Sequence, residues 1–202
     1  MSLAYKLAYR IGFTPWERAG EAGQQQLAAL LDREEEGRQA PYGKALDLGC
    51  GRGLHSLALA RRGWDVTGID VVPQAVEAAQ NGAESEDVDV NFVCADVTAM
   101  SPADVGKDFE FLLDIGCFHG LRDEQRMAMA ASVDAVAADE ATLLLLAFQP
   151  GRRGPLPRGA SEADIASAFS GWSLVDEVAA ETSGMPGPLK KAAPRFCRLR
   201  RG

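Results

Sequence analysis

Short apolar runs alternate along the chain with segments in which apolar residues recur at helical spacing. Five of these runs predict buried strands of a parallel sheet, at residues 45–48, 66–69, 88–94, 109–115 and 141–148. Three intervening segments predict helices, at residues 54–62, from Pro73 to just before Asn81-Gly82, and at residues 122–138. A helix capped by Ser161 and strands at residues 172–178 and 194–200 are expected to complete the pattern. Strands separated by helices predict an α/β fold in which helices cover both faces of the sheet.

The length and composition indicate a single domain spanning residues 1–202. A chain of 202 residues is long enough to bury a core, and 47% hydrophobic with 25% charged residues is ordinary for a soluble globular protein. Two loops rich in proline and glycine, at residues 149–159 and 182–194, interrupt this domain without dividing it.

The charge balance argues against some partners. A net charge of −8 and a pI near 4.8 disfavour nucleic acid, because phosphate binding needs a basic face. Arg152, Arg153 and Arg158, and the basic residues within 190–201, are expected to be solvated surface, although the first group could instead attract an anionic substrate. No apolar run is long enough to cross a bilayer, so no membrane partner is expected.

The cysteines and histidines argue against a metal site. Four cysteines are scattered singly, without a C-x-x-C pair, and the chain contains two histidines. Such cysteines are typical of reduced thiols in a cytoplasmic protein. We therefore expect a cytoplasmic, metal-free protein that acts on a small molecule as a monomer or a homodimer.

The segment 44–70, KALDLGCGRGLHSLALARRGWDVTGID, joins a buried strand, a glycine-rich turn, a helix and a second strand that ends in Asp70. Gly49, Gly51 and Gly53 allow the backbone to turn sharply and a ligand to approach it without meeting a Cβ atom. A carboxylate about 20 residues after such glycines accepts hydrogen bonds from ribose hydroxyls in dinucleotide sites. The segment therefore predicts a nucleotide-type pocket.

Two kinds of ligand use such a pocket. A pyrophosphate-binding turn has the pattern G-x-G-x-x-G, but Leu54 occupies the position of the third glycine. Asp47, two residues before the first glycine, would repel a pyrophosphate and suits a ligand with an ammonium group. S-adenosylmethionine has an α-amino group, a sulfonium and no phosphate. The residues favour this ligand over a dinucleotide, and a structural turn with incidental glycines is the remaining alternative.

This segment resembles the first motif, D/E-x-G-x-G-x-G, of the class I S-adenosylmethionine-dependent methyltransferases. The resemblance implies a Rossmann-like three-layer sandwich with a seven-stranded, mostly parallel sheet and an antiparallel last strand. It also implies a cofactor site whose residues, from the methionine part through the ribose to the adenine, are Asp47, Gly49, Cys50, Gly51, Gly53, Asp70, Val71, Asp96 and Val97. Asp114 belongs to the fourth motif, which lines the methyl-transfer region. Asp96 and Asp114 could each be turn-forming residues instead.

Residues 12–17, GFTPWE, and the helical run 24–36 are similar to the N-terminal element of the small thiol, thiopurine, halide and tellurite methyltransferases. The sequences DIGCFH and FQPG also resemble the corresponding segments of proteins in this group. The resemblance implies that residues 1–40 form a helical lid segment and residues 41–202 the cofactor-binding core. Phe13 and Trp16 would then cover the sulfonium, since aromatic faces attract a cation. Alternatively, Trp16 packs on the sheet at the start of a helix.

Methyl transfer from a sulfonium, which leaves S-adenosylhomocysteine, mainly requires that the acceptor be held in line with the S–CH3 bond. A general base helps only acceptors that must lose a proton. His119, in the loop after the fourth strand, is the candidate base, and lining the substrate pocket with Phe13 and Phe118 is its alternative role. We expect a soft acceptor, namely a thiol, a halide or a metalloid oxyanion. The alternatives are an O- or N-methyltransferase of a phenol, quinone or similar metabolite, and a non-catalytic module that binds the cofactor or its demethylated product.

Overall fold

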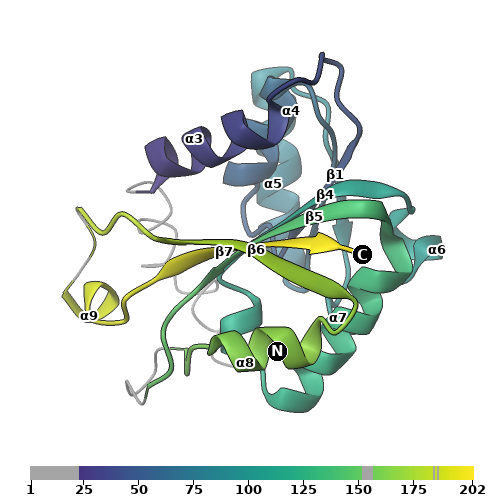
Figure 1. Cartoon of the computed structure of the whole chain (residues 1–202). Helices are drawn as coiled ribbons and strands as arrows, with labels where there is room; N and C mark the ends of the chain where they lie inside the picture. The colour runs from purple at the N-terminus through teal and green to yellow at the C-terminus, as the bar shows by residue number, and fades with distance from the viewer. Residues whose placement is uncertain (1–22, 152–156, 184, 186) are drawn as a thin grey trace.

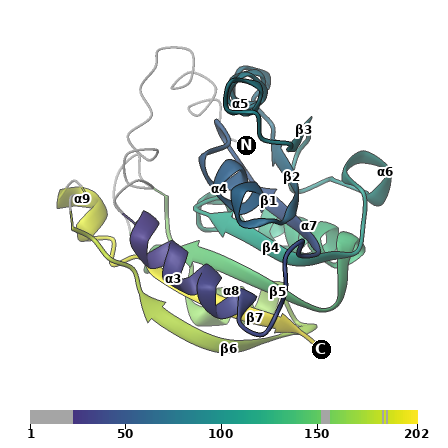
Figure 2. The ribbon, with the colours of Figure 1, turned by 90° about the horizontal axis from the view of Figure 1, so that it is seen from above.

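A seven-stranded sheet organises the computed structural model, which describes residues 23–151, 157–183, 185 and 187–202 (Figure 1). The strands are β1 (Lys44–Leu48), β2 (Asp65–Asp70), β3 (Asn91–Cys94), β4 (Phe109–Ile115), β5 (Ala137–Ala147), β6 (Trp172–Ala179) and β7 (Arg195–Arg201). Their order in the sheet is β3-β2-β1-β4-β5-β7-β6, which Figure 2 shows from one edge to the other. The first five strands pair in parallel, and β7 runs antiparallel to both β5 and β6. The expected sheet, with its antiparallel last strand, is therefore confirmed.

The order of the strands reverses at β1. The chain proceeds outward from β1 through β2 to β3, then returns to the other side of β1 to form β4 and β5. Ligands of open α/β sheets bind at such a reversal point, outside the carboxyl ends of the strands. Asp47 lies beside Gly68 of β2 on one side and Leu113 of β4 on the other. The carboxyl ends of β1, β2 and β4 therefore meet at one edge of the sheet.

Helices cover both faces of the sheet (Figure 1). One face carries α3 (Gln24–Glu35), α4 (Leu54–Arg62) and α5 (Pro73–Glu86), and the other carries α6 (Pro102–Val105), α7 (Asp123–Val136) and α8 (Glu162–Ala168). Alternate residues of the strands pack on opposite faces: Ala45 of β1 packs with Leu59 of α4, whereas Leu46 belongs to the core beneath Met129 and Val133 of α7. The two cores make this the three-layer sandwich that the resemblance implies.

Several predicted boundaries are wrong. The helix that begins at Pro73 does not stop before Asn81-Gly82 but continues to Glu86, and it ends at Asp87, which adopts a left-handed conformation (φ 53°). A glycine within a helix costs only about 1 kcal/mol, which the packing of Ala79 and Ala83 can offset. Strand β3 begins at Asn91, later than expected, and β5 begins at Ala137, directly after α7. The short elements α6, 3₁₀ helix η1 (Phe118–Gly120) and α9 (Gly187–Lys190) were not expected.

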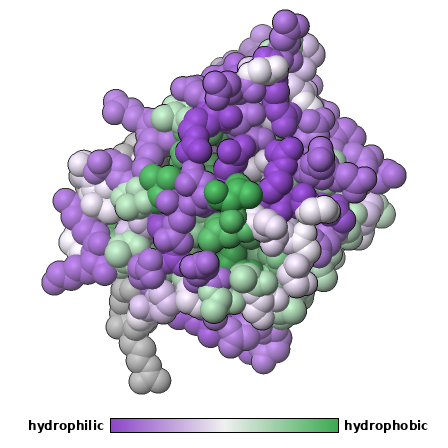
Figure 3. All heavy atoms as spheres, viewed as in Figure 1, coloured by the Kyte–Doolittle hydropathy of each residue, from purple (hydrophilic) through white to green (hydrophobic). Residues whose placement is uncertain are grey.

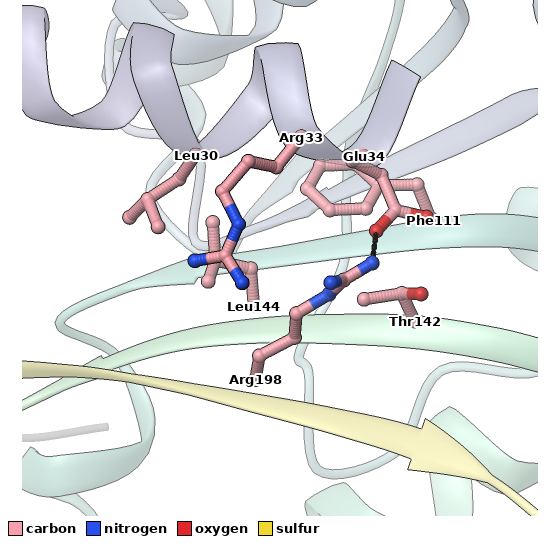
Figure 4. A pocket seen from close by; sticks show the side chains of 7 residues that line it. All are labelled: Leu30, Arg33, Glu34, Phe111, Thr142, Leu144 and Arg198. Carbon is pink, nitrogen blue, oxygen red and sulfur yellow. Dashed lines mark hydrogen bonds and ion pairs between the residues drawn. The ribbon is translucent and has the colours of Figure 1, made fainter. Parts of the chain in front are cut away.

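Helix α3 is attached to the sheet by both apolar and polar contacts. Leu27 and Leu31 are buried against the sheet, while Gln26 donates to the carbonyl of Ala179 at 2.8 Å and accepts from the N–H of Glu181 at 2.6 Å. Farther along the helix, Glu34 forms an ion pair with Arg198 of β7 (Figure 4). The contacts fix the end of the N-terminal region to the last two strands.

A small cavity remains between α3 and the sheet (Figure 4). Its volume is about 10 Å³, and the Glu34–Arg198 ion pair is part of its lining. A cavity of this size holds one water at most. It also lies under α3, away from the carboxyl ends of β1, β2 and β4, so it is a packing gap and not a ligand site.

The exposed edge of the sheet is formed by β6. Its residues alternate between buried or half-buried and exposed, and Val175 is 55% exposed. Figure 3 shows a small hydrophobic area near the middle of this view of the molecule, surrounded by hydrophilic side chains. Asp176 and Glu177 follow Val175 directly, and charged residues on an edge strand oppose pairing with another sheet.

Candidate active site at the carboxyl ends of β1, β2 and β4

The turn after β1 is joined to the end of β2. The N–H groups of Gly49 and Cys50 both donate to the carbonyl of Ile69, each at 2.8 Å. Gly49, Gly51 and Gly53 have φ values of 76°, 55° and 83°, a left-handed region in which residues with a Cβ are strained. The sequence folds locally into this turn because glycines stand at all three positions.

Close packing around Gly53 also excludes a side chain at this position. A Cβ atom at this position would lie 2.8 Å from the ring of Phe92 and 3.0 Å from the methyl group of Ala79. Gly53 is also the residue immediately before α4. It therefore allows the start of α4 to pack closely on β3 and α5, whereas its predicted contact with a ligand remains a prediction.

Asp70, the last residue of β2, is held by the backbone around it. Its carboxylate accepts the N–H of Gly51 at 3.1 Å and the N–H of Val72 at 2.9 Å. Burial raises the pKa of Asp70, and hydrogen bonds from Val72, Gly51 and Val71 oppose that shift. Asp70 thus connects the glycine turn to the loop after β2, with its carboxylate at the expected edge of the sheet.

Asp47 lies beneath the glycine turn and faces α4. It is 1% exposed, and its carboxylate accepts a hydrogen bond from the hydroxyl of Ser56 at 2.6 Å. Ser56 can approach because its neighbour on β2, Gly68, has no side chain: a Cβ on Gly68 would be 2.8 Å from the Ser56 Oγ. Burial raises the pKa of Asp47 to about 6, the Ser56 hydrogen bond opposes this, and the negative charge of Asp70 adds to it.

Asp114, near the end of β4, organises the following loop. It is fully buried, and its two carboxylate oxygens accept the N–H groups of Cys117 at 2.7 Å and Phe118 at 2.8 Å. Burial raises the pKa of Asp114 to about 7, against the effect of these hydrogen bonds. These bonds correspond to the turn-forming role that the sequence left open. Burial, followed by the charge of Asp114, also raises the pKa of the Cys117 thiol, which disfavours Cys117 as a nucleophile.

Asp96 and Val97 lie in the loop after β3. The Asp96 carboxylate accepts the backbone N–H of Thr98 at 2.9 Å and its hydroxyl at 2.8 Å. Burial raises the pKa of Asp96, but the hydrogen bonds from Thr98 lower it, and the net shift is downward. The Val97 side chain packs in the core on the α7 face. Asp96 therefore makes a local turn, and its predicted contact with adenine remains a prediction.

His119 is buried in the loop that Asp114 organises. Its Nδ1 atom accepts a hydrogen bond from the backbone N–H of Phe148 at 3.1 Å, and the two rings stack with centroids 4.3 Å apart. Since Nδ1 is an acceptor, the neutral imidazole carries its proton on Nε2. A Cβ on Gly116 would lie 3.5 Å from this Nε2, so that edge of the ring faces the start of the loop. A neutral ring in this tautomer cannot take up a proton at Nε2.

The structure thus brings together three of the predicted carboxylates, Asp47, Asp70 and Asp114, at the tips of adjacent strands. These carboxylates interact electrostatically: the charge of Asp70 raises the pKa of Asp47, and the charge of Asp47 raises the pKa of Asp114. A cationic ligand would favour their ionised forms, so they fit a molecule with an ammonium and a sulfonium group. Phe13 and Trp16 lie outside the described residues.

Two contributors to the site were missed in the sequence. Ser56 is the third residue of α4. Its position three residues after Gly53 could have indicated that it faces β1. Arg126 is 3% exposed in α7 and contacts the loop of His119, but its sequence context resembles a solvent-exposed helical position. The basic C-terminal residues were expected to be solvated surface, and Arg195 contradicts this, being 4% exposed.

The described part of the chain has neither a metal-binding cluster nor a helix that could span a membrane. No group of three or more histidine, cysteine, aspartate or glutamate side chains there is arranged to hold a metal ion. Among the described helices, none has the length and apolar character needed to cross a membrane.

Comparison with known proteins identifies the family. The methyltransferase domain family matches residues 45–140, which include the glycine turn and all three strand-tip carboxylates. An uncharacterized methyltransferase of Schizosaccharomyces pombe is 30% identical over 103 residues, which cover 51% of this chain and 70% of that protein. The ubiquinone biosynthesis O-methyltransferase of Coxiella burnetii is 34% identical over 82 residues, which cover 41% of this chain but only 34% of that protein.

The fold agrees with this assignment. The structure of a Burkholderia thailandensis 1,6-didemethyltoxoflavin N1-methyltransferase, with S-adenosylhomocysteine bound, superposes with a TM-score of 0.74 at 21% identity, over 98% of this chain and 85% of that one. The sequence motif, the sheet order and the family match agree, and they decide against the dinucleotide alternative. The chain belongs to the class I S-adenosylmethionine-dependent methyltransferases.

Proposed function

We propose that this protein transfers the methyl group of S-adenosylmethionine to a small acceptor that arrives as a soft anion, such as a thiolate, a halide or a metalloid oxyanion. When bound, S-adenosylmethionine supplies an electrophilic methyl group on a sulfonium that is already a good leaving group. Asp47 and the glycine turn would hold its methionine part, Asp70 with Val71 its ribose, and Asp96 with the Val97 N–H its adenine. Residues 1–40, with Phe13 and Trp16, would form the lid.

The observation that carries the choice of acceptor is the hydrogen bond from the Phe148 N–H to Nδ1 of His119. With Nδ1 occupied as an acceptor, the Nε2–H edge can donate a hydrogen bond but cannot remove a proton. Such a group suits an acceptor that brings negative charge or a lone pair. We therefore propose that His119 contacts and orients the acceptor, together with Phe118, and does not act as a general base.

An anionic acceptor also makes a base unnecessary. Holding two reactants in line provides effective molarities of about 10⁵–10⁸ M, equivalent to roughly 7–11 kcal/mol of the barrier. A general base adds about 10²–10⁴-fold where a proton must be lost. Positioning by the loops after β4 and β5 is thus sufficient for a thiolate or a halide.

The Coxiella burnetii relative offers a second candidate, methylation of a phenolic or quinone-derived oxygen. Its similarity is confined to 82 residues, about a third of that protein, and so it supports the cofactor half more than the acceptor. A third candidate is a non-catalytic module that binds the cofactor or its product. The four separate free cysteines support a reducing compartment such as the cytoplasm for any of these functions.

A labelled-methyl assay separates these candidates. S-adenosylmethionine with a labelled methyl group is offered with a panel of thiols, halides, metalloid oxyanions, phenols and amines, using the wild type, His119→Gln and His55→Gln. We expect label on the soft anions, with His119→Gln within about tenfold of the wild type because glutamine keeps a donor, and His55→Gln unchanged. Selective labelling of phenols, with a loss of about 10²–10⁴-fold in His119→Gln, would support the base role instead. Tight cofactor binding without transfer to any acceptor would support the non-catalytic module.

A further inference from the structure

Arg126 connects the loops that follow β4 and β5. Its guanidinium group is buried beside the 3₁₀ turn η1, where Nε donates to the carbonyl of Phe118 at 3.4 Å and Nη2 to the carbonyl of His119 at 3.3 Å. The same Nη2 donates to the carbonyl of Gly159, in the loop after β5. The guanidinium carbon also lies 5.1 Å from the centre of the Phe118 ring, within the range of a cation–π contact.

These contacts belong to a closed circuit of hydrogen bonds around His119. The N–H of Ala160 donates to the carbonyl of Phe148 at 3.0 Å, and the N–H of Phe148 donates to the His119 imidazole. Arg126 completes the circuit, since it contacts the carbonyls of both His119 and Gly159. The imidazole is therefore held from two directions, by its own backbone and through Phe148.

A second buried arginine supports the same loop from the sheet. Arg195, at the start of β7, donates from Nη2 to the carbonyl of Ala160 at 3.0 Å, and its Nε lies 2.8 Å from a carboxylate oxygen of Glu177. Consecutive carbonyls, of Gly159 and Ala160, are thus bound by Arg126 and Arg195. Residues 159 and 160 are therefore bound to both α7 and β7.

We propose that Arg126 is a positioning residue for methyl transfer, which sets the orientation and tautomer of His119 by tying the loop after β4 to the loop after β5. This inference rests on the proposed function. Arg126 acts on the acceptor only through His119 and Phe118. Loss of its contacts would let the two loops separate, weaken the Phe148–His119 hydrogen bond and release the imidazole from a single orientation.

The test is Arg126→Lys, because lysine keeps the charge but lacks the planar set of donors that reaches three carbonyls. Arg126→Gln is the second variant, since it removes the buried charge and keeps an amide donor. Arg122→Lys, at an exposed position just before α7, is the matched control. Long-range ¹H–¹⁵N spectra report the histidine tautomers, and they are easily assigned because the chain has two histidines.

We expect Arg126→Lys to lose the single Nε2–H signature of His119, and to lower kcat/KM for the acceptor by about 10- to 100-fold, as a misplacement of about 1 Å can do. The Kd for S-adenosylhomocysteine should stay within twofold, because Asp47 and Asp70 lie on other strands. Arg122→Lys should match the wild type. A folded Arg126→Lys or Arg126→Gln protein with an unchanged His119 signature and unchanged kcat/KM would overturn the proposal. If the wild type binds the cofactor and transfers no methyl group, the proposed function fails, while the His119 spectra still decide whether Arg126 positions the ring.

Discussion

The backbone N–H of Gly51, in the turn after β1, donates a hydrogen bond at 3.1 Å to the carboxylate of Asp70, at the end of β2. This bond joins the glycine turn to the residue predicted to bind the ribose. Each carboxylate oxygen has two lone pairs, so Asp70 can hold the turn and still accept from a ligand hydroxyl. Asp70 thereby holds the glycine turn and, in the proposed site, would also bind the ribose.

Asp70→Ala is expected to weaken the binding of S-adenosylmethionine by about 1–3 kcal/mol, the range for a lost hydrogen bond to a charged group. The matched control is Asp65→Ala, at the opposite end of the same strand, where the side chain is exposed. Titration calorimetry of both variants checks the expectation. Equal affinities for Asp70→Ala and the wild type would remove Asp70 from the cofactor site.

The binding of a cationic cofactor should depend on pH through Asp47. Burial raises the pKa of Asp47 to about 6, so the free protein binds a proton there as the pH falls through 6. A bound ammonium favours the ionised carboxylate, and this proton must be lost on binding. Affinity should therefore fall about tenfold between pH 7 and pH 5, with a limiting slope of one proton per molecule. Calorimetry across this range should show a weaker but flatter profile for Asp47→Asn, and an equally steep profile would exclude Asp47 as the cause.

The free energy of unfolding of the free protein should depend on pH in the opposite direction to the cofactor affinity, and decrease as the pH rises. Burial raises the pKa of Asp114 to about 7, from an ordinary value near 4, so the folded protein holds a proton that the unfolded chain releases. Its contribution to the free energy of unfolding is therefore present below about pH 4 and is lost as the pH rises through 7. In urea titrations at pH 5 and pH 8, the stability advantage of the wild type over Asp114→Asn should be larger at pH 5. A larger advantage at pH 8 would contradict the assignment.

Gly159 should tolerate no side chain, because the backbone of the β5 loop passes against it. Its φ is 81°, and a Cβ atom would lie 2.2 Å from the carbonyl oxygen of Gln149. Gly37 has a similar φ of 78° with no atom within 4 Å of that position, so it is the matched control. Gly37→Ala should cost about 1–2 kcal/mol of unfolding free energy for the left-handed conformation alone. Gly159→Ala should cost clearly more, and equal losses in chemical denaturation would show that the backbone at Gln149 does not lie against Gly159.

The sequence predicted the sheet and the glycine turn at its carboxyl edge because both depend on local patterns. Strands such as β1 and β4 are mostly apolar runs, and the turn can be recognised from its glycines, which readily adopt positive φ. The end of α5 was missed because packing of its alanines outweighed the turn signal of Asn81-Gly82.

Contacts between distant segments were harder to foresee. The role of Arg126 depends on carbonyls from residues 118, 119 and 159, and no periodicity within α7 reveals them. The tautomer of His119 likewise depends on Phe148, which is 29 residues away. Such contacts follow from the sheet order, which brings the loops after β4 and β5 together.

We propose that the carboxylates of Asp47 and Asp70, at the ends of β1 and β2, recognise S-adenosylmethionine. Titration calorimetry of the wild-type protein with S-adenosylmethionine and, separately, with NADH is the decisive measurement. We predict saturable binding of S-adenosylmethionine at one site per chain and no heat of binding with NADH. Saturable binding of NADH, or no binding of S-adenosylmethionine, would show that this site does not recognise the sulfonium cofactor.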